Sequence, residues 1–340
     1  MATLEWVAKL HNGHTGFWDE WLSNKYGQPL GFQVSVVRGK WVVRDTRLPD
    51  LKIGDVIEQL NDSPVDVLFQ TQRKYISTSS DTQARNALFY LPYLFPERFT
   101  INVEGGRTVE IDREHQKLLP RGPQKTQGKL LASGKVGYIR IPSFSDPELE
   151  SDALKFVKEY GKLAAIVIDV RQNGGGSTPS GLIAALMNRS YREWAESTPI
   201  QIGIVNWQLG SASHPTYHIP SDPDQPDASA YQGKVVLLVD DGCGSACEDF
   251  VVPFKDNQRA VLVGATTTGS SGQPYFIRFP NGMSFHVSTK RESFPDGKQF
   301  EGVGIKPDVE LEPSIDDLRN GKDPVLEKAL EIALQPGTVR

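Results

Sequence analysis

A serine follows a strongly apolar run and a glycine-rich turn in residues 235–250, whose sequence is VVLLVDDGCGSACEDF. Ser245 lies where the predicted strand has ended and a helix begins. Backbone N–H groups at the start of that helix can face a developing negative charge. A serine at such a position is often only a helix cap. The position also suits nucleophilic attack, with stabilisation of the resulting oxyanion.

A serine hydroxyl is a weak nucleophile that needs a base, a group to orient the base and donors for the oxyanion. The sequence offers a candidate for each role: His14, Glu301 and the glycine run at residues 174–176. Histidine suits the base role because its side chain titrates near neutrality. Lys255 lies further along the helix that follows Ser245, so we expect its side chain to point away from the serine.

Other histidines leave alternatives open for the base. His11 lies one helical turn before His14 and is the rival base, and His14 itself could be a solvated loop residue. His11 and His14 as a metal pair would need further ligands that the sequence does not supply. His214 and His218 lie in a long polar segment, where we expect them to be solvated or to face substrate.

Cys243 and Cys247 are the only cysteines, so the sequence predicts no disulfide framework. They are four residues apart, which places them on one face of a helix. We expect both to be buried as small apolar groups. No nearby histidine or further cysteine completes a metal site.

The elements that must position these residues alternate between strands and helices from residue 135 onward. Strands are predicted at residues 136–141, 164–170, 235–239 and 260–264, and helices at 146–160, 180–188 and from 246 to about 254. This alternation predicts an α/β fold with a largely parallel sheet. The carboxyl ends of parallel strands meet at one edge, so Ser245 and residues 174–176 are expected there.

The first third of the chain has a different pattern. Residues 28–112 have the short apolar strands and glycine turns of a compact β-rich module. Residues 113–134 are polar and rich in proline and glycine, which predicts a linker. Residues 205–233 are rich in Ser, Pro, Asp and Gln, which is typical of a lid or a binding loop.

Composition excludes several classes of function. The chain has 340 residues with 38% hydrophobic and 23% charged residues and a net charge of −5. It contains no basic tract for nucleic acid and no apolar run long enough to cross a membrane. No signal peptide follows Met1, and residues 3–10 resemble the last turns of a helix, which indicates a longer natural chain. The compartment is therefore left open, with exported or periplasmic origin included.

Four segments in order resemble the C-terminal processing and tricorn-core family of serine peptidases. Residues 135–176 contain the Asp-x-Arg-x-Asn-x-Gly-Gly pattern, and residues 245–248 (SACE) resemble the nucleophile segment. Residues 301–308 (EGVGIKPD) resemble the family's tail motif. Residues 28–112 resemble its embedded PDZ domain, with PLGF at residues 29–32 as the carboxylate-binding loop.

The resemblance implies a ClpP/crotonase-like βαβ core with an inserted PDZ-like domain. The chain then divides into a helical segment carrying a catalytic histidine, the PDZ-like domain, a linker and the α/β peptidase core. The corresponding ranges are residues 1–27, 28–112, 113–134 and 135–340.

The family has two catalytic types, and the resemblance assigns this chain to one. Processing peptidases place a catalytic lysine after the nucleophile helix, but residues 264–272 contain none, and Ser270 stands in its place. Tricorn-like members instead use serine, histidine and glutamate. The resemblance therefore implies a site of Ser245, His14 and Glu301, in which Glu301 supports the hydrogen bonding through another polar side chain.

The remaining site residues are also implied by the resemblance. The N–H groups of Ala246 and of Gly174 or Gly175 would form the oxyanion hole. The N–H groups of three residues of the PDZ-like loop would hold the carboxylate of a peptide: Leu30, Gly31 and Phe32. No metal or organic cofactor is expected.

The predicted function is that of a serine endopeptidase that cleaves unfolded or flexible polypeptides through an acyl-enzyme. Two alternatives remain at the level of sequence. One is a non-catalytic ligand-binding protein on the same scaffold, and the other is an acyl hydrolase or peptide cyclase with a dedicated substrate, because triad chemistry is the same for these reactions. Oligomeric state is left open.

Overall fold

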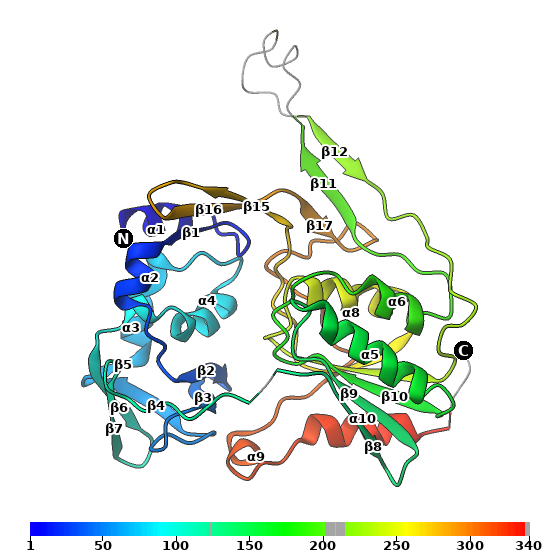
Figure 1. Ribbon diagram of the computed structural model, residues 1–340, viewed down its shortest axis with the longest axis horizontal. Helices are drawn as coiled ribbons and strands as arrows, with labels where there is room; N and C mark the ends of the chain where they lie inside the picture. Colours follow the sequence, from blue (N-terminus) through cyan, green and yellow to red (C-terminus); the bar gives the residue numbers. More distant parts are fainter. Residues whose placement is uncertain (123, 201–207, 209–214, 337–340) are drawn as a thin grey trace. The chain divides into compact units, whose positions relative to one another are not determined.

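The computed structural model describes residues 1–122, 124–200, 208 and 215–336. The chain forms two compact units (Figure 1). Unit 1 comprises Met1–Pro123, Pro274–Val287 and Pro313–Pro324. Unit 2 comprises Gln124–Gln273, Ser288–Glu312 and Val325–Arg340. Each unit has its own buried apolar core.

Unit 2 is built on a six-stranded sheet with the order β18-β14-β13-β10-β9-β8. The strands are β8 (Gln127–Leu131), β9 (Val136–Arg140), β10 (Ala165–Asp169), β13 (Lys234–Val239), β14 (Ala260–Gly264) and β18 (Val309–Glu310). Neighbouring strands are parallel except for β8, which pairs antiparallel with β9. The predicted α/β fold with a largely parallel sheet is confirmed.

Helices cover both faces of this sheet (Figure 1). The helices α5 (Pro147–Glu159), α6 (Ser180–Leu186) and α8 (Ala246–Asp256) contribute to the core cluster on one face. On the other face, α10 (Pro324–Leu334) packs against a second cluster that contains residues of β10 and β13. All five residues of β10 are buried, which explains why its sequence is continuously apolar up to Asp169.

The segment that composition predicts as a linker contains a strand. Residues Gln127–Leu131 form β8 at the edge of the unit 2 sheet. Gly128 allows this because a Cβ atom there would lie 2.3 Å from the ring of Phe156 on α5. The strand therefore depends on close packing against a helix, which local composition does not reveal.

Unit 2 also carries a small sheet with the order β12-β11-β17, formed by β12 (Thr216–Ile219), β11 (Ala195–Pro199) and β17 (Arg291–Ser293). Part of the predicted lid or binding loop is therefore a strand, because the TYHI sequence of β12 favours extended structure. The predictions for residues 205–207 and 209–214, His214 included, lie outside the described residues.

Unit 1 contains a second six-stranded sheet with the order β2-β3-β4-β6-β7, and β5 pairs with β4. Its strands are β2 (Phe32–Val37), β3 (Lys40–Thr46), β4 (Val56–Leu60), β5 (Ser63–Pro64), β6 (Arg98–Val103) and β7 (Arg107–Asp112). The helices of this region are α3 (Val65–Gln72) and α4 (Asp81–Ala87) with the short 3-10 helices η1 (Arg73–Tyr75), η2 (Leu88–Tyr90) and η3 (Pro92–Leu94).

The amino-terminal segment of unit 1 is tied to residues far along the chain. Its elements are α1 (Ala2–Ala8), β1 (Gly16–Asp19) and α2 (Glu20–Tyr26). β1 pairs with β16 (Met283–Ser288), which forms a hairpin with β15 (Pro274–Arg278). Helix α9 (Ile315–Arg319) packs on Val37, Val42 and Val56 of the larger sheet. None of the described helices has the length and apolarity needed to cross a membrane.

Candidate active site

Ser245 is the N-cap residue of α8, directly after the turn that follows β13. Its backbone has φ 55° and ψ −127°, a combination that residues with a side chain rarely adopt. Its N–H donates to the carbonyl oxygen of Ser270 at 3.0 Å and to Oε2 of Glu248 at 3.2 Å. The half-buried serine is therefore presented on a sharp strand-to-helix turn that other segments hold in place.

Gly175 lies against this turn from the loop after β10. A Cβ atom on Gly175 would lie 2.8 Å from Cβ of Ser245 and 2.9 Å from the backbone nitrogen of Ala246. The φ of Gly175 is +99°, which also favours glycine. Three residues predicted for the site, Ser245, Ala246 and Gly175, are thus brought together at the carboxyl edge of the unit 2 sheet.

The backbone N–H groups near Ser245 differ in whether they already donate to an acceptor within the protein. The Gly175 N–H donates to Oδ1 of Asn173 at 2.9 Å, so it already has a partner. Ala246 is the first residue of α8, where an N–H has no acceptor within its own helix. A Cβ atom on Gly174 would meet nothing within 4 Å, so the backbone of Gly174 borders open space. The Ala246 N–H and the exposed Gly174 therefore remain candidates as oxyanion donors.

Glu248 was not predicted as a site residue, yet it organises the turn. Its buried carboxyl group accepts hydrogen bonds from the Thr267 hydroxyl and from the N–H groups of Gly269, Ser270 and Ser245. Burial raises the pKa of Glu248 to about 8, while these four hydrogen bonds act in the opposite direction. The sequence signal was the pairing of a serine N-cap with a glutamate three residues later, which is a capping box.

Glu301 contacts Ser270 and Ser271, in the loop that also supplies hydrogen bonds to Glu248. The Ser270 hydroxyl lies 3.4 Å from Oε1 of Glu301, and the Ser271 N–H donates to Oε2 at 3.3 Å. Ser270 is buried. Its carbonyl oxygen accepts from the Ser245 N–H. Glu301 therefore reaches the nucleophile turn through Ser270.

The prediction for the two cysteines is wrong in one respect. Cys243 and Cys247 are both buried, as expected, but they form a disulfide with a Cα–Cα distance of 5.4 Å. The pairing requires the sharp turn at Ser245, which brings Cys243 back towards the first turn of α8. A periodicity argument that treats both residues as helical does not foresee that turn.

His14 lies in unit 1, whereas Ser245 and Glu301 lie in unit 2. The backbone N–H of His14 donates to Oδ1 of Asn12 at 3.0 Å. Burial, and to a lesser extent the neighbouring His286, lower the pKa of His14 to about 4. A histidine with this pKa is neutral at neutral pH and able to accept a proton. The rival His11 is exposed, as is His218 on β12.

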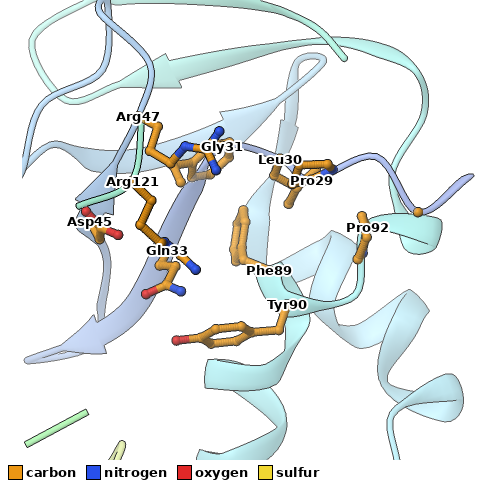
Figure 2. A pocket seen from close by; sticks show the side chains of 12 residues that line it. Pro29, Leu30, Gly31, Gln33, Asp45, Arg47, Phe89, Tyr90, Pro92 and Arg121 are labelled. Carbon is orange, nitrogen blue, oxygen red and sulfur yellow. The ribbon is translucent and has the colours of Figure 1, made fainter. Parts of the chain in front are cut away.

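Unit 1 contains a pocket at the loop before β2, with a volume of about 320 Å³ (Figure 2). Leu30, Gly31 and Phe32, the residues predicted to bind peptide, all line it. The other lining residues are Gly27, Pro29, Gln33, Asp45, Arg47, Phe89, Tyr90, Pro92 and Arg121. Figure 2 shows residues 29–31 along one side of the pocket and the ring of Phe89 below them. Gly31 has φ +86°, which turns the chain into β2.

The described part of the chain brings no three histidine, cysteine, aspartate or glutamate side chains together in a way that could hold a metal ion.

The chain belongs to peptidase family S41, a family of serine peptidases, whose model matches residues 135–311. This match covers the unit 2 strands β9 to β18 together with Ser245 and Glu301. The family predicted from the four sequence motifs is confirmed.

The names of two sequence relatives agree with the assignment to this family. The chain is 28% identical over 212 residues to the carboxyl-terminal-processing peptidase 3 of Arabidopsis thaliana chloroplasts, covering 61% of this chain and 38% of that protein. It is 28% identical over 207 residues to the tricorn protease of Thermoplasma acidophilum, covering 60% of this chain and 17% of that protein. The chain thus spans well under half the length of these relatives.

A solved structure resembles the whole chain. The structure of mature CPAF complexed with lactacystin superposes with a TM-score of 0.72 at 17% identity, and the match covers 97% of this chain and 86% of that one. At this identity the likeness establishes the fold alone.

Proposed function

We propose that this chain is a serine endopeptidase that cleaves unfolded or flexible polypeptides through an acyl-enzyme formed on Ser245. The observation that carries the proposal is the meeting of Ser245, Ala246 and Gly175 at the carboxyl edge of a parallel sheet. The strained backbone of Ser245 supports it, because residues held in sparsely populated conformations cluster at functional sites. The two named relatives are a peptidase and a protease, which supports a polypeptide substrate.

In the proposed reaction, Ser245 Oγ attacks the scissile carbonyl carbon while His14 accepts its proton. The N–H groups of Ala246 and Gly174 donate hydrogen bonds to the oxyanion. The protonated His14 then donates its proton to the leaving amine, and the acyl group stays on Ser245. A water molecule deprotonated by His14 attacks the acyl-enzyme and releases the product acid.

Two arguments favour His14 as the base. Residues 264–272 contain no lysine, so the dyad of the processing peptidases is not available from this segment. The lowered pKa of His14 keeps its imidazole neutral at neutral pH, as a base requires. Glu301 would act as a positioning residue through Ser270, whose carbonyl oxygen accepts from the Ser245 N–H.

Labelling with a fluorophosphonate probe tests these assignments. We expect a covalent adduct on Ser245, located by mass spectrometry, that is absent in Ser245→Ala and reduced by about a thousandfold in rate in His14→Ala. His11→Ala is the matched control and should label like the wild type. Retention of peptidase activity by Ser245→Ala would refute the nucleophile. An adduct that forms at full rate in His14→Ala would refute only the base.

We also propose that the unit 1 pocket binds the carboxyl terminus of a peptide. The backbone at Leu30, Gly31 and Phe32 would hold the terminal carboxylate, because a loop that leads into a strand can direct several N–H groups at one anion. Arg47 and Arg121 also line the pocket and, with Asp45 opposing one of them, leave a net positive charge beside this loop. An extended peptide would then continue along the edge of β2, which pairs with β3 on its other side.

A further inference from the structure

The only two cysteines of the chain flank the proposed nucleophile. The disulfide between Cys243 and Cys247 closes a ring across a sequence separation of 4. The residues inside this ring are Gly244, Ser245 and Ala246, which include the proposed nucleophile and a proposed oxyanion donor. Both cysteines are fully buried, so the bond lies beneath the turn that carries Ser245.

The turn inside this ring needs external support. Ser245 has a φ of 55° without being a glycine, and such a conformation persists only where the surrounding structure enforces it. If the backbone relaxed towards an ordinary conformation, both Ser245 Oγ and the Ala246 N–H would change direction. The geometry of attack and of oxyanion binding therefore depends on whatever holds these three residues.

Noncovalent contacts hold the turn from several directions. The Gly244 N–H donates to the carbonyl oxygen of Asn173 at 3.1 Å, and the Thr268 N–H donates to that of Cys243 at 2.9 Å. The Ser245 N–H is held by Ser270 and Glu248. The disulfide adds a covalent tie between the two ends of the turn, and Sγ of Cys247 lies 3.6 Å from the carbonyl oxygen of Val170 after β10.

A disulfide that closes so short a ring acts mainly on local geometry. The effect of a cross-link on the unfolded chain grows with the length of the loop that it closes, and this loop is very short. The buried core of unit 2 involves many residues of β10, β13, α6 and α8 besides these cysteines. We therefore expect unit 2 to stay folded without the bond, while the turn inside the ring becomes less well fixed.

We propose that the Cys243–Cys247 disulfide is a positioning device for catalysis, which holds Ser245 and the Ala246 N–H in the geometry that acylation requires. This inference rests on the proposed function, because it assumes Ser245 as the nucleophile. Opening the bond lowers the rate of acylation and kcat by roughly tenfold or more, since small misplacements of reacting groups have large effects on rate. Substrate affinity, expressed in KM, stays close to its original value.

Dithiothreitol opens the bond in a balanced exchange. One thiolate of dithiothreitol attacks a sulfur atom of the Cys243–Cys247 disulfide, which forms a mixed disulfide and releases one cysteine. The second thiol of the reagent then attacks the mixed disulfide, which releases the other cysteine and leaves the reagent as a cyclic disulfide. Two electrons and two protons pass to Cys243 and Cys247, which become thiols, and the reagent is oxidised to its cyclic disulfide. Alkylation with iodoacetamide followed by mass spectrometry counts the thiols in each sample.

The experiment compares the oxidised wild type, the reduced wild type and the variant Cys243→Ala/Cys247→Ala. For each sample we would measure the rate of fluorophosphonate labelling at Ser245, kcat and KM on a flexible peptide, and circular dichroism. We expect the reduced wild type and the double variant to be slower in labelling and in kcat, with KM unchanged. Reoxidation should restore only the wild type, and dithiothreitol should not affect the variant.

Two results would overturn the inference while leaving the proposed function intact. One is labelling of the double variant at the rate of the oxidised wild type. The other is loss of folded structure in both the variant and the reduced wild type, since the bond would then support the whole unit. No labelling of Ser245 in the oxidised wild type would instead refute the proposed function, and with it this inference.

Discussion

At the scale of single residues, the candidate site depends on groups whose protonation the protein alters. Glu248 and His14 are both shifted by burial, but in opposite directions. Burial disfavours the charged form of each group, so it raises the pKa of the carboxyl and lowers that of the imidazole. For His14 burial favours the neutral imidazole, which suits it to accepting a proton from a serine, whereas the four hydrogen bonds that Glu248 accepts oppose the effect of burial on its carboxyl group.

The lowered pKa of His14 predicts where activity is lost in acid. The rate of fluorophosphonate labelling should be nearly constant from neutral pH down to about 5 and then fall through the pKa of about 4, because protonated His14 cannot act as a base. The folded pKa lies below the ordinary value of 6.5, so stability also declines as pH falls from 6.5 towards 4. Labelling rates must therefore be corrected for the folded fraction, measured by circular dichroism.

His11→Asn is the control for this pH profile. The exposed His11 is expected to contribute nothing, so the variant should give the wild-type curve. A midpoint near 6.5 in the wild type would contradict the prediction, because it would mean that the base titrates as a solvated imidazole.

The candidate residues were visible in the sequence because their types are distinctive. A serine between a strand and a helix, a glycine run after another strand and a Glu-Gly-x-Gly segment each carry a local signal. Glu248 and the disulfide were underestimated, because both depend on how the chain turns at Ser245. The spacing of the two cysteines alone does not give the direction of their side chains across a turn.

At the scale of elements, glycines decide how closely loops approach strands. Gly31 and Gly39 flank β2, and both have positive φ, of +86° and +79°. They differ in their surroundings, because a Cβ atom on Gly31 would lie 2.4 Å from Cδ2 of Leu118, whereas one on Gly39 would meet nothing within 4 Å. The two positions thus share backbone strain but differ in packing, and Gly31 lines the pocket whereas Gly39 is not among its lining residues.

This difference predicts a selective loss of peptide binding. Gly31→Ala should weaken binding of a peptide with a free carboxyl terminus by about tenfold or more, because a side chain at φ +86° strains the backbone of the loop that would hold the carboxylate, and the added methyl group also meets the Leu118 side chain. Gly39→Ala should leave affinity within about twofold, although both variants lose some stability. Fluorescence anisotropy with a labelled peptide measures this, and the same peptide with an amidated terminus should bind weakly. Equal binding of the acid and the amide would contradict the carboxylate role.

Strands with continuous apolar runs were predicted within a few residues of their ends, as β9, β10, β13 and β14 illustrate. The hairpin of β15 and β16 turns at residues 281–282, an Asn-Gly pair that is typical of such turns. Its pairing with β1 was not predicted, because the register of two strands so distant in sequence leaves no local signal. Long-range pairing and helix packing are therefore what the sequence pattern omits.

At the scale of the whole molecule, the order of the four motifs identified the family, but not the two units. Residues Pro274–Val287 and Pro313–Pro324 belong to unit 1, although they follow much of unit 2 in sequence. The hairpin joins β1, and Ile315 and Leu318 of α9 pack on the apolar face of β2 to β4. Membership of a unit is thus set by contacts that link distant parts of the chain.

Each unit contains a buried arginine that binds backbone carbonyl groups. In unit 1, Arg113 donates to the carbonyl oxygens of Tyr26, Gln28, Phe95 and Pro96. In unit 2, Arg259 donates to those of Leu186 and Tyr231. Burial lowers the pKa of Arg259 to about 10, which still leaves it charged at neutral pH. Each guanidinium group therefore joins several segments within its own unit.

Replacing either arginine with methionine should destabilise its own unit. Arg113→Met and Arg259→Met each leave buried carbonyl groups without a donor, which costs roughly 3 kcal/mol in the free energy of unfolding. Hydrogen exchange measured by mass spectrometry in rising denaturant would assign the loss to peptides of unit 1 or unit 2. Arg98→Met is the control, because its ion pair with Asp112 is exposed and worth little. Because each unit has its own core, we expect separate effects, and an equal loss in both units from either variant would show that they unfold as one.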